Sequence, residues 1–248
     1  MMLWLRSVVF NIVFYVTMIV ICILALPTLL LPYRVLIATA RLWARINVAL
    51  LRAICGVRYE FRGTERIPKG ALLVASKHQS MWETFALLLV LDDPTYILKR
   101  ELMWIPLFGW FTWKAGMVAV NRGKGARALA AMMTRARAEL ARGRQIVIFP
   151  EGTRRRPGAE PKYKYGVAHL YQALEVPCLP LALNSGLFWP RRSLLRFPGT
   201  IVVEALPPIP PSLDRDAFFE RLKHDTEAAT ARLVEEGRRE QRGRARGG

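Results

Sequence analysis

Short apolar runs alternate with amphipathic stretches along most of the chain. The apolar runs have the length of buried strands, and the stretches between them have the periodicity of helices. Predicted strands cover residues 57–61, 71–75, 95–98, 117–120, 145–149, 179–183 and 200–205. Predicted helices cover residues 82–91, 126–142, 165–174 and 214–236. This alternation predicts an α/β fold with a mostly parallel central sheet flanked by helices.

The N-terminal segment departs from that alternation. Residues 8–31 contain no charged side chain, and as a helix they would be about 36 Å long, against about 30 Å of bilayer hydrocarbon. Pro27 and Pro32 end this helix, and residues 36–51 then mix apolar positions with arginines, as an interfacial helix does. We expect a membrane-embedded two-helix anchor, which either spans the bilayer or lies in one leaflet. A buried helix of a soluble core is the alternative, whereas the length of the run and the lack of an A-x-A site disfavour a cleaved signal peptide.

The excess of basic residues in the composition indicates that the protein binds an anionic partner. The 248 residues include 37 Lys or Arg against 19 Asp or Glu, a net charge of +18, and the 52% of hydrophobic residues excludes a disordered chain. Five arginines follow the apolar segment before the next acid, Glu60; they are Arg34, Arg41, Arg45, Arg52 and Arg58. Such a flank is typical of the cytoplasmic face of a membrane. We therefore expect the inner (cytoplasmic) membrane, with the α/β domain on its cytoplasmic face.

Together these patterns divide the chain into three parts. Residues 1–54 form the predicted anchor, and residues 55–237 form the α/β domain. Residues 238–248 hold five arginines, three glycines and one glutamate, which predicts a disordered basic tail. The three cysteines form no CxxC pair, which excludes a disulfide scaffold and a cysteine-rich zinc module.

The first candidate for chemistry is the sequence KHQSMWE at residues 77–83. It follows a predicted buried strand and opens a helix, the place where a parallel sheet presents its functional groups. His78 can accept a proton from a hydroxyl, and a carboxylate on its other ring nitrogen would fix the tautomer. Ser80-x-x-Glu83 also fits a capping box, so the sequence leaves open whether Glu83 partners His78 or only caps the helix.

The second candidate is FPEGTR at residues 149–154, directly after a predicted strand. Its backbone N–H groups and guanidinium can receive phosphate, although an exposed turn with solvated arginines explains the same residues. NRGKG at residues 121–125 precedes a predicted helix but lacks the complete phosphate-loop pattern. Lys99 follows another strand and is either a further phosphate contact or a solvated charge. No G-x-S-x-G elbow occurs, which argues against Ser76, Ser80 or Thr153 as a nucleophile.

Taken together, four motifs resemble those of the glycerolipid acyltransferases over about residues 55–210. They are His78-x4-Glu83, Arg122 after its apolar strand, FPEGTR at residues 149–154, and VPCLP at residues 176–180. Glu83 stands where the family commonly has Asp, and Ala119 where it often has an aromatic residue. The resemblance implies that His78 is a general base with Glu83 as its partner. It also implies that Arg122 and the turn formed by Glu151, Gly152, Thr153 and Arg154 contact a glycerol phosphate, for which Lys99 is a further candidate contact.

This resemblance implies transfer of a fatty acyl group from acyl-CoA or acyl carrier protein to the sn-2 hydroxyl of 1-acyl-glycerol-3-phosphate, which gives phosphatidic acid. Trp104, Phe108 and Trp110 lie in an aromatic stretch that either lines an acyl-chain groove, dips into lipid or packs in the core. Expected partners are lysophosphatidic acid, the acyl donor and anionic membrane lipid, with no nucleic acid. No cofactor is expected, and no metal, because the histidines at 78, 169 and 224 lack ligand spacing. The alternatives are another acceptor, such as a lyso-ornithine lipid or a lysophospholipid, or a non-catalytic membrane-anchored protein that binds anionic lipid or nucleic acid.

Overall fold

All seven predicted strands are present in the computed structural model, which describes residues 1–121 and 125–246, and their ends differ from the prediction by at most one residue. The strands are β1 (Val57–Arg62), β2 (Leu72–Ser76), β3 (Pro94–Lys99), β4 (Val118–Val120), β5 (Gln145–Ile148), β6 (Cys178–Leu183) and β7 (Gly199–Ala205). They form one sheet in the order β1-β7-β6-β2-β5-β3-β4.

This sheet is mostly parallel, as predicted. Neighbouring strands run parallel in every pair except β6 with β7. The C-terminal ends of β2, β3, β4, β5 and β6 therefore share one edge of the sheet, which we call the carboxyl edge. The segments that follow these strands carry the residues singled out from the sequence.

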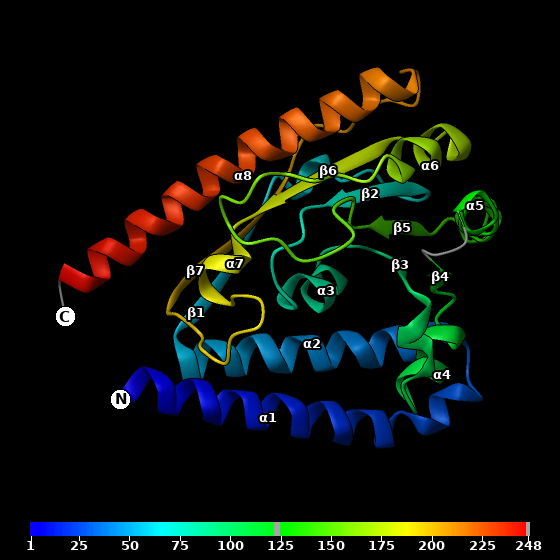
Figure 1. The fold of residues 1–248 in the computed structure, drawn as a ribbon. Helices are drawn as coiled ribbons and strands as arrows, with labels where there is room; N and C mark the ends of the chain where they lie inside the picture. The colour runs from blue at the N-terminus through cyan, green and yellow to red at the C-terminus, as the bar shows by residue number, and fades with distance from the viewer. Residues whose placement is uncertain (122–124, 247–248) are drawn as a thin grey trace.

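Helices cover both faces of the sheet (Figure 1). On one face lie α5 (Gly125–Leu140), α6 (Gly166–Leu174) and α8 (Arg215–Arg246), and on the other lie α1 (Met2–Leu24), α2 (Tyr33–Cys55) and α3 (Trp82–Ala86). Short helices complete the fold; they are α4 (Phe108–Lys114), α7 (Ser185–Phe188) and the 3-10 turns η1 (Leu26–Leu29), η2 (Thr64–Arg66), η3 (Leu87–Leu89) and η4 (Arg100–Trp104).

The predicted helix at residues 82–91 is shorter than expected. It ends at Ala86 and tightens into η3. Arg41 of α2 donates to the carbonyl oxygens of Leu88 (3.0 Å) and Leu91 (2.8 Å). These carbonyl oxygens therefore bind the Arg41 side chain instead of the backbone N–H groups that a longer helix would supply.

The basic tail predicted to be disordered is helical as far as the structure describes it, because α8 continues to Arg246. Glu240 accepts hydrogen bonds from the Thr200 N–H (2.8 Å) and from Arg244 one turn later (3.1 Å). Arg58 of β1 pairs with the same carboxylate at 3.3 Å. Contacts with β1 and β7, which composition does not reveal, keep this part of the chain in the helix.

Both helices expected in the anchor are present, antiparallel and along the base of the molecule (Figure 1). Phe10 and Phe14 of α1 are almost fully buried. Their rings meet Trp189 at 5.4 Å between centroids, and Phe14 also meets Phe85 of α3 at 5.8 Å. One side of α1 therefore belongs to the same core as the helices under the sheet.

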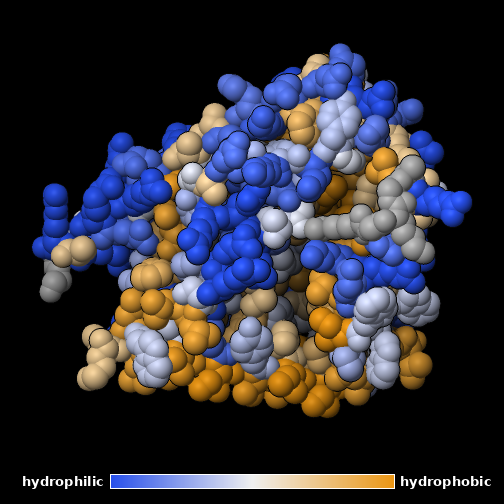
Figure 2. All heavy atoms as spheres, in the orientation of Figure 1, coloured by the Kyte–Doolittle hydropathy of each residue, from blue (hydrophilic) through white to orange (hydrophobic). Residues whose placement is uncertain are grey.

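The opposite side of α1 is an exposed apolar surface (Figure 2). Residues 41–68% exposed on it are Trp4, Leu5, Val9, Ile12, Tyr15, Val16, Ile19, Val20, Ile23 and Leu24. Within the described residues, α1 is the one helix long and apolar enough to cross a membrane. We call this surface the apolar base.

The aromatic stretch also faces outward rather than into the core. Trp104 is 70% exposed, Trp110 57% and Phe108 38%. Gly109 lies so close to Met103 that an added Cβ would be 1.9 Å from the Met103 carbonyl oxygen, so only glycine permits this tight fold of η4 on α4. Core packing, one of the three expectations for this stretch, is therefore wrong for these rings.

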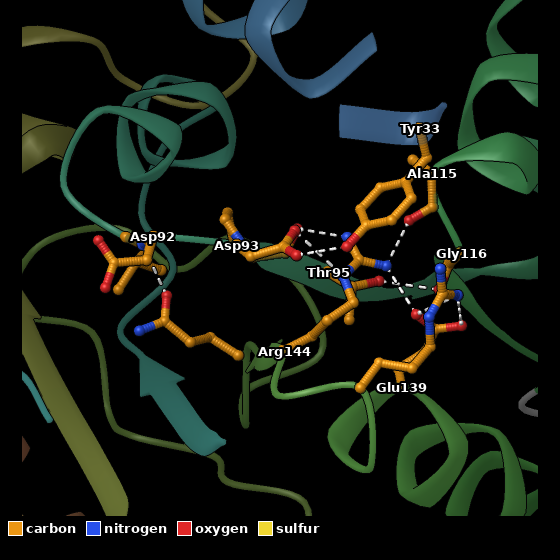
Figure 3. Close-up of polar contacts among 12 residues, drawn as sticks. Tyr33, Asp92, Asp93, Thr95, Ala115, Gly116, Glu139 and Arg144 are labelled. Atoms are coloured by element: carbon orange, nitrogen blue, oxygen red, sulfur yellow. Dashed lines mark hydrogen bonds and ion pairs between the residues drawn. The ribbon is translucent and has the colours of Figure 1, made fainter. Parts of the chain in front are cut away.

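A buried arginine fastens this aromatic stretch to the sheet (Figure 3). Arg144, just before β5, is fully buried and donates to Asp93 (3.1 Å), to Glu139 of α5 (2.7 Å) and to the Ala115 carbonyl after α4 (2.7 Å). Its guanidinium lies over the ring of Tyr33, 4.7 Å from the centroid, and the Tyr33 hydroxyl donates to Asp93 at 2.6 Å. The network joins the start of α2, the end of α4 and α5 at the edge opposite the carboxyl edge.

Candidate active site

The structure brings His78 and Glu83 into contact at the carboxyl edge. His78 lies two residues beyond β2, and Glu83 lies in the first turn of α3. The distance from His78 Nδ1 to Glu83 Oε1 is 2.9 Å. Because a carboxylate accepts, Nδ1 carries the proton and Nε2 keeps its lone pair. Nε2 has no hydrogen-bond partner within the described residues, and the side chain is 14% exposed.

Glu83 also binds backbone N–H groups at the start of its helix, so the same carboxylate contacts His78 and the helix end. Its Oε1 accepts the N–H groups of Gln79 (2.8 Å) and Ser80 (2.7 Å), while Ser80 Oγ accepts the Trp82 N–H (2.8 Å). The bond from the Ser80 N–H to Glu83 is one half of a capping box, whereas the serine hydroxyl accepts the N–H of Trp82 rather than that of Glu83. The second oxygen, Oε2, accepts the hydroxyl of Ser185 at 2.8 Å. The carboxylate is fully buried and held from several sides.

The serines considered as nucleophiles are engaged elsewhere. Ser76 donates to the Lys77 carbonyl at 3.0 Å, and Ser80 accepts the helix N–H. Both are fully buried. Neither presents a hydroxyl that His78 contacts.

Phe149 and the turn after it lie against His78. The Phe149 ring stacks on the imidazole with 4.1 Å between centroids. The Arg155 N–H donates to the His78 carbonyl at 2.7 Å. Gly152 has φ +65°, a conformation that favours glycine, and its N–H closes the turn onto the Phe149 carbonyl at 2.8 Å. The turn is therefore built against the histidine.

Glu151 supports the site from inside. Its carboxylate is fully buried and accepts the His78 backbone N–H (3.2 Å) and Lys77 Nζ (2.9 Å). Lys77 also pairs with Glu227 of α8 at 2.5 Å. Burial raises the pKa of Glu151 above that of an ordinary carboxyl, and the Lys77 ammonium opposes this effect. Both oxygens of Glu151 bond within the protein, which differs from the phosphate contact expected of it.

The other expected phosphate contacts are on the surface or outside the described residues. Thr153 is exposed and Arg154 is half-buried in the turn after β5. Lys99 is exposed at the end of β3, on the same edge. Arg122 follows β4 but lies outside the described residues. The fourth motif, residues 176–180, lies at the start of β6, at the edge opposite the carboxyl edge. It is connected to the site only through β6, the strand that leads to Ser185.

Three contacts were missed by sequence reasoning. Ser185, Lys77 and Glu227 had no assigned role, although Ser185 follows a predicted strand that ends at the carboxyl edge. That position is a signal that could have found it. No group of three His, Cys, Asp or Glu side chains within residues 1–121 and 125–246 is arranged to hold a metal ion.

Comparisons with known proteins identify relatives of this chain. Residues 58–184 match the family model described as Acyltransferase. The chain is 38% identical over 161 residues to 1-acyl-sn-glycerol-3-phosphate acyltransferase of Pseudomonas aeruginosa, a match that covers 65% of this chain and 63% of the relative. It is 32% identical over 170 residues to the mouse 1-acyl-sn-glycerol-3-phosphate acyltransferase alpha, with 66% of this chain and 60% of the relative covered. The matches thus span less than two thirds of these relatives.

The fold is similar to a solved structure along nearly all of both chains. The crystal structure of the 1-acyl-sn-glycerophosphate acyltransferase PlsC from Thermotoga maritima superposes with a TM-score of 0.77, covering 92% of this chain and 96% of that one. The sequence identity is 21%, so this likeness supports the fold, including a sheet flanked by helices.

Proposed function

This chain belongs to the acyltransferase family, and from that membership and the geometry of its site we propose that it transfers a fatty acyl group from an acyl thioester to the sn-2 hydroxyl of 1-acyl-glycerol-3-phosphate, giving phosphatidic acid. The relatives' names support the acceptor. The residues assigned to the chemistry lie within the matched segment.

The contact between His78 and Glu83 carries this proposal. Glu83 fixes the Nδ1–H tautomer at 2.9 Å and leaves the basic Nε2 for an incoming hydroxyl. A purely structural histidine does not need a fully buried carboxylate held by two backbone N–H groups and a serine. This arrangement also favours an enzyme over a binding protein that uses only its arginines.

The reaction proceeds without a covalent enzyme intermediate. His78 Nε2 takes the proton of the acceptor hydroxyl while that oxygen attacks the thioester carbonyl carbon. The tetrahedral intermediate then expels the thiolate, which receives the proton from the imidazolium. The Glu83 carboxylate stabilises the imidazolium between these steps. The products are the ester and the free thiol.

Phosphate recognition belongs to the turn after β5 and to the neighbouring strand ends. Arg154, Arg122 and Lys99 supply positive charge, Thr153 supplies a hydroxyl donor, and Gly152 gives the turn its shape. We assign Glu151 to positioning instead. It holds the His78 backbone and Lys77, and a buried carboxylate would repel a phosphate.

The partners follow from the same reaction. The donor is acyl-CoA or acyl carrier protein, and the acceptor is lysophosphatidic acid in a membrane. Because Trp104, Phe108 and Trp110 are exposed, as the apolar base is, we expect their rings in lipid or along the acyl chain. No cofactor enters this mechanism.

We assign the protein to the cytoplasmic face of the inner membrane, held in one leaflet. One side of α1 packs on the protein along the base, whereas its other side is apolar and exposed (Figure 2). A helix with Phe10 and Phe14 in the core lies along the membrane surface rather than projecting through it. The arginines of α2 favour the cytoplasmic side.

The test is acyl transfer from a thioester to lysophosphatidic acid by purified protein in detergent. His78→Ala should lower turnover by at least about 10²-fold, because a general base is lost. The matched control is His224→Ala, whose side chain is 82% exposed on α8 and should leave the rate unchanged.

A panel of acceptors separates the proposed substrate from its alternatives. Lyso-ornithine lipid and lysophospholipids should be poorer acceptors than lysophosphatidic acid. Near-normal transfer by His78→Ala would refute the mechanism, and a better rate with another lysolipid would refute the acceptor.

A further inference from the structure

Five arginines from two distant segments gather beside the turn after β5. Residues 154–156 follow β5, whereas Arg191 and Arg192 lie in the loop between α7 and β7. Arg191 Nη1 donates to the Arg154 carbonyl oxygen. Across residues 1–121 and 125–246, none of the five forms an ion pair with a carboxylate, although several other arginines near β1 and α8 do.

No carboxylate within the described residues balances the positive charge of this cluster of arginines. Burial, and then the guanidinium groups of the other four, lower the pKa of Arg191. The Nε atom of Arg155 is buried and meets no acceptor in the part of the chain that is described. Uncompensated positive charge of this kind favours the binding of an anion.

The loop that carries Arg191 and Arg192 is hydrogen-bonded to α1. Asn11 of α1 accepts from Arg196 Nη2 at 2.6 Å and donates to the Leu194 carbonyl at 2.7 Å. The Arg196 N–H donates to Ser7 of α1 at 2.9 Å. Leu194 is 64% exposed in this loop. The loop therefore joins the apolar base on one side and the turn after β5 on the other.

We propose that Arg191 and Arg192 form a lipid-phosphate site at the membrane side of the active site, which receives the phosphate monoester of the acceptor before Arg154 and His78 engage it. This inference rests on the proposed function. Both arginines lie outside the segment matched by the family model, residues 58–184.

A lipid phosphate fits this place better than the phosphates of a soluble donor. The acceptor's acyl chain stays in the bilayer, so its phosphate travels at the level of the headgroups. A loop bonded to α1 lies at that level, with an exposed leucine beside the two arginines. A soluble thioester has no need of a path along the membrane.

The kinetic test uses full-length protein in lipid–detergent micelles. The double variant Arg191→Gln with Arg192→Gln should raise the KM for lysophosphatidic acid by at least about tenfold, because charge-assisted contacts are lost. The kcat and the KM for the acyl donor should stay unchanged. The matched control removes the same charge from two exposed positions far from the loop, Arg135→Gln with Arg215→Gln, and should leave all three parameters unchanged.

Two further variants separate charge from packing. Arg192→Gln alone removes an exposed side chain without a hydrogen bond in the described structure, and should still raise the KM for the acceptor. Arg191→Lys keeps the charge and should recover most of the affinity lost in Arg191→Gln. A rise in the KM for the donor alone would assign the arginines to the thioester carrier and overturn the proposal.

A binding test does not depend on activity. Flotation with phosphatidylcholine vesicles that contain lysophosphatidic acid should show weaker binding for the double variant than for the control pair. Vesicles that contain phosphatidylglycerol should show a smaller difference, since a diester carries less charge than a monoester. An equal difference for both vesicles would mean general attraction to an anionic surface and would overturn the site. If the parent binds lysophosphatidic acid vesicles in this pattern but transfers no acyl group, the proposed function fails while the site stands.

Discussion

At the scale of single residues, the Glu83 carboxylate combines helix capping with support of an imidazole. Oε1 receives His78 Nδ1 and two backbone N–H groups, and Oε2 receives Ser185. An amide oxygen can accept the backbone bonds, but it cannot stabilise an imidazolium with a negative charge. Capping and catalysis can therefore be separated by substitution.

Glu83→Gln should lose at least about 10²-fold in turnover, the lower end of general acid–base effects. Its free energy of unfolding should stay within about 1 kcal/mol of the parent, the scale of a helix cap. Turnover with lysophosphatidic acid and denaturant unfolding measure the two quantities on the same preparation.

Glu83→Asp is the matched variant that keeps the charge, and it should be more active than Glu83→Gln although its reach is shorter by one methylene. A Gln variant as active as the parent would leave Glu83 as a cap only. The catalytic assignment of the pair would then be wrong.

Local spacing left the pairing of these two residues open, and the resemblance to the glycerolipid acyltransferases implied it. His78 and Glu83 lie five positions apart, so strand, turn and helix signals put them near one another, but these signals do not reveal the groups that surround them. Ser185 and Glu227 reach the site from the end of β6 and from α8, and their contacts depend on strand order and helix docking. Only the folded sheet brings such distant positions together.

At the scale of elements, Arg144 holds α2, α4 and α5 against the start of β3 and β5 (Figure 3). Arg144→Met should lower the free energy of unfolding by about 3–5 kcal/mol, because the half-buried carboxylates of Asp93 and Glu139 lose their shared buried cation and the Ala115 carbonyl loses its donor. Denaturant unfolding followed by tryptophan fluorescence measures this change.

Arg142→Gln provides the control for this network. Arg142 also pairs with Glu139, at 3.3 Å, but its side chain is 52% exposed, so its loss should cost less than about 1 kcal/mol. Equal effects of the two substitutions would contradict a special role for the buried arginine.

Element prediction succeeded where a segment's own pattern decides its structure. Buried apolar runs such as residues 72–76 gave strands within one residue of their ends. The helix at residues 82–91 was overestimated because Arg41, from α2, binds the carbonyl groups where it would continue. Residues 238–246 of the tail are helical rather than disordered because Glu240 bonds to β7, a contact that no local pattern contains.

At the scale of the whole molecule, α1 has one side in the core and the other in the apolar base. Replacing Ile12, Val16 and Ile19 with Gln should lower partitioning into vesicles by at least about 100-fold, because three exposed apolar side chains lose their transfer free energy. Liposome flotation measures the partitioning, and activity in detergent should persist since Phe10 and Phe14 remain.

The control is Glu220→Gln with Lys223→Gln on α8, which changes two charges of opposite sign and should float like the parent. Unchanged flotation of the α1 variant would contradict the membrane assignment of this surface. Deleting residues 1–31 is a less specific test, because it also removes Phe10 and Phe14 from the core.

The bonds between α1 and the loop around Leu194 also constrain the order of events during synthesis. Asn11 and Leu194 are 183 positions apart, and β1 pairs with β7 through Val57 and Gly199. A growing chain therefore delivers the apolar helix to the membrane long before its polar partners leave the ribosome. Until then Asn11 lacks Arg196 and β1 is an unpaired strand, so the nascent protein is exposed to aggregation and proteolysis. Early attachment to the bilayer shelters the helix, and translation of residues 194–205 then supplies the missing partners of α1 and β1.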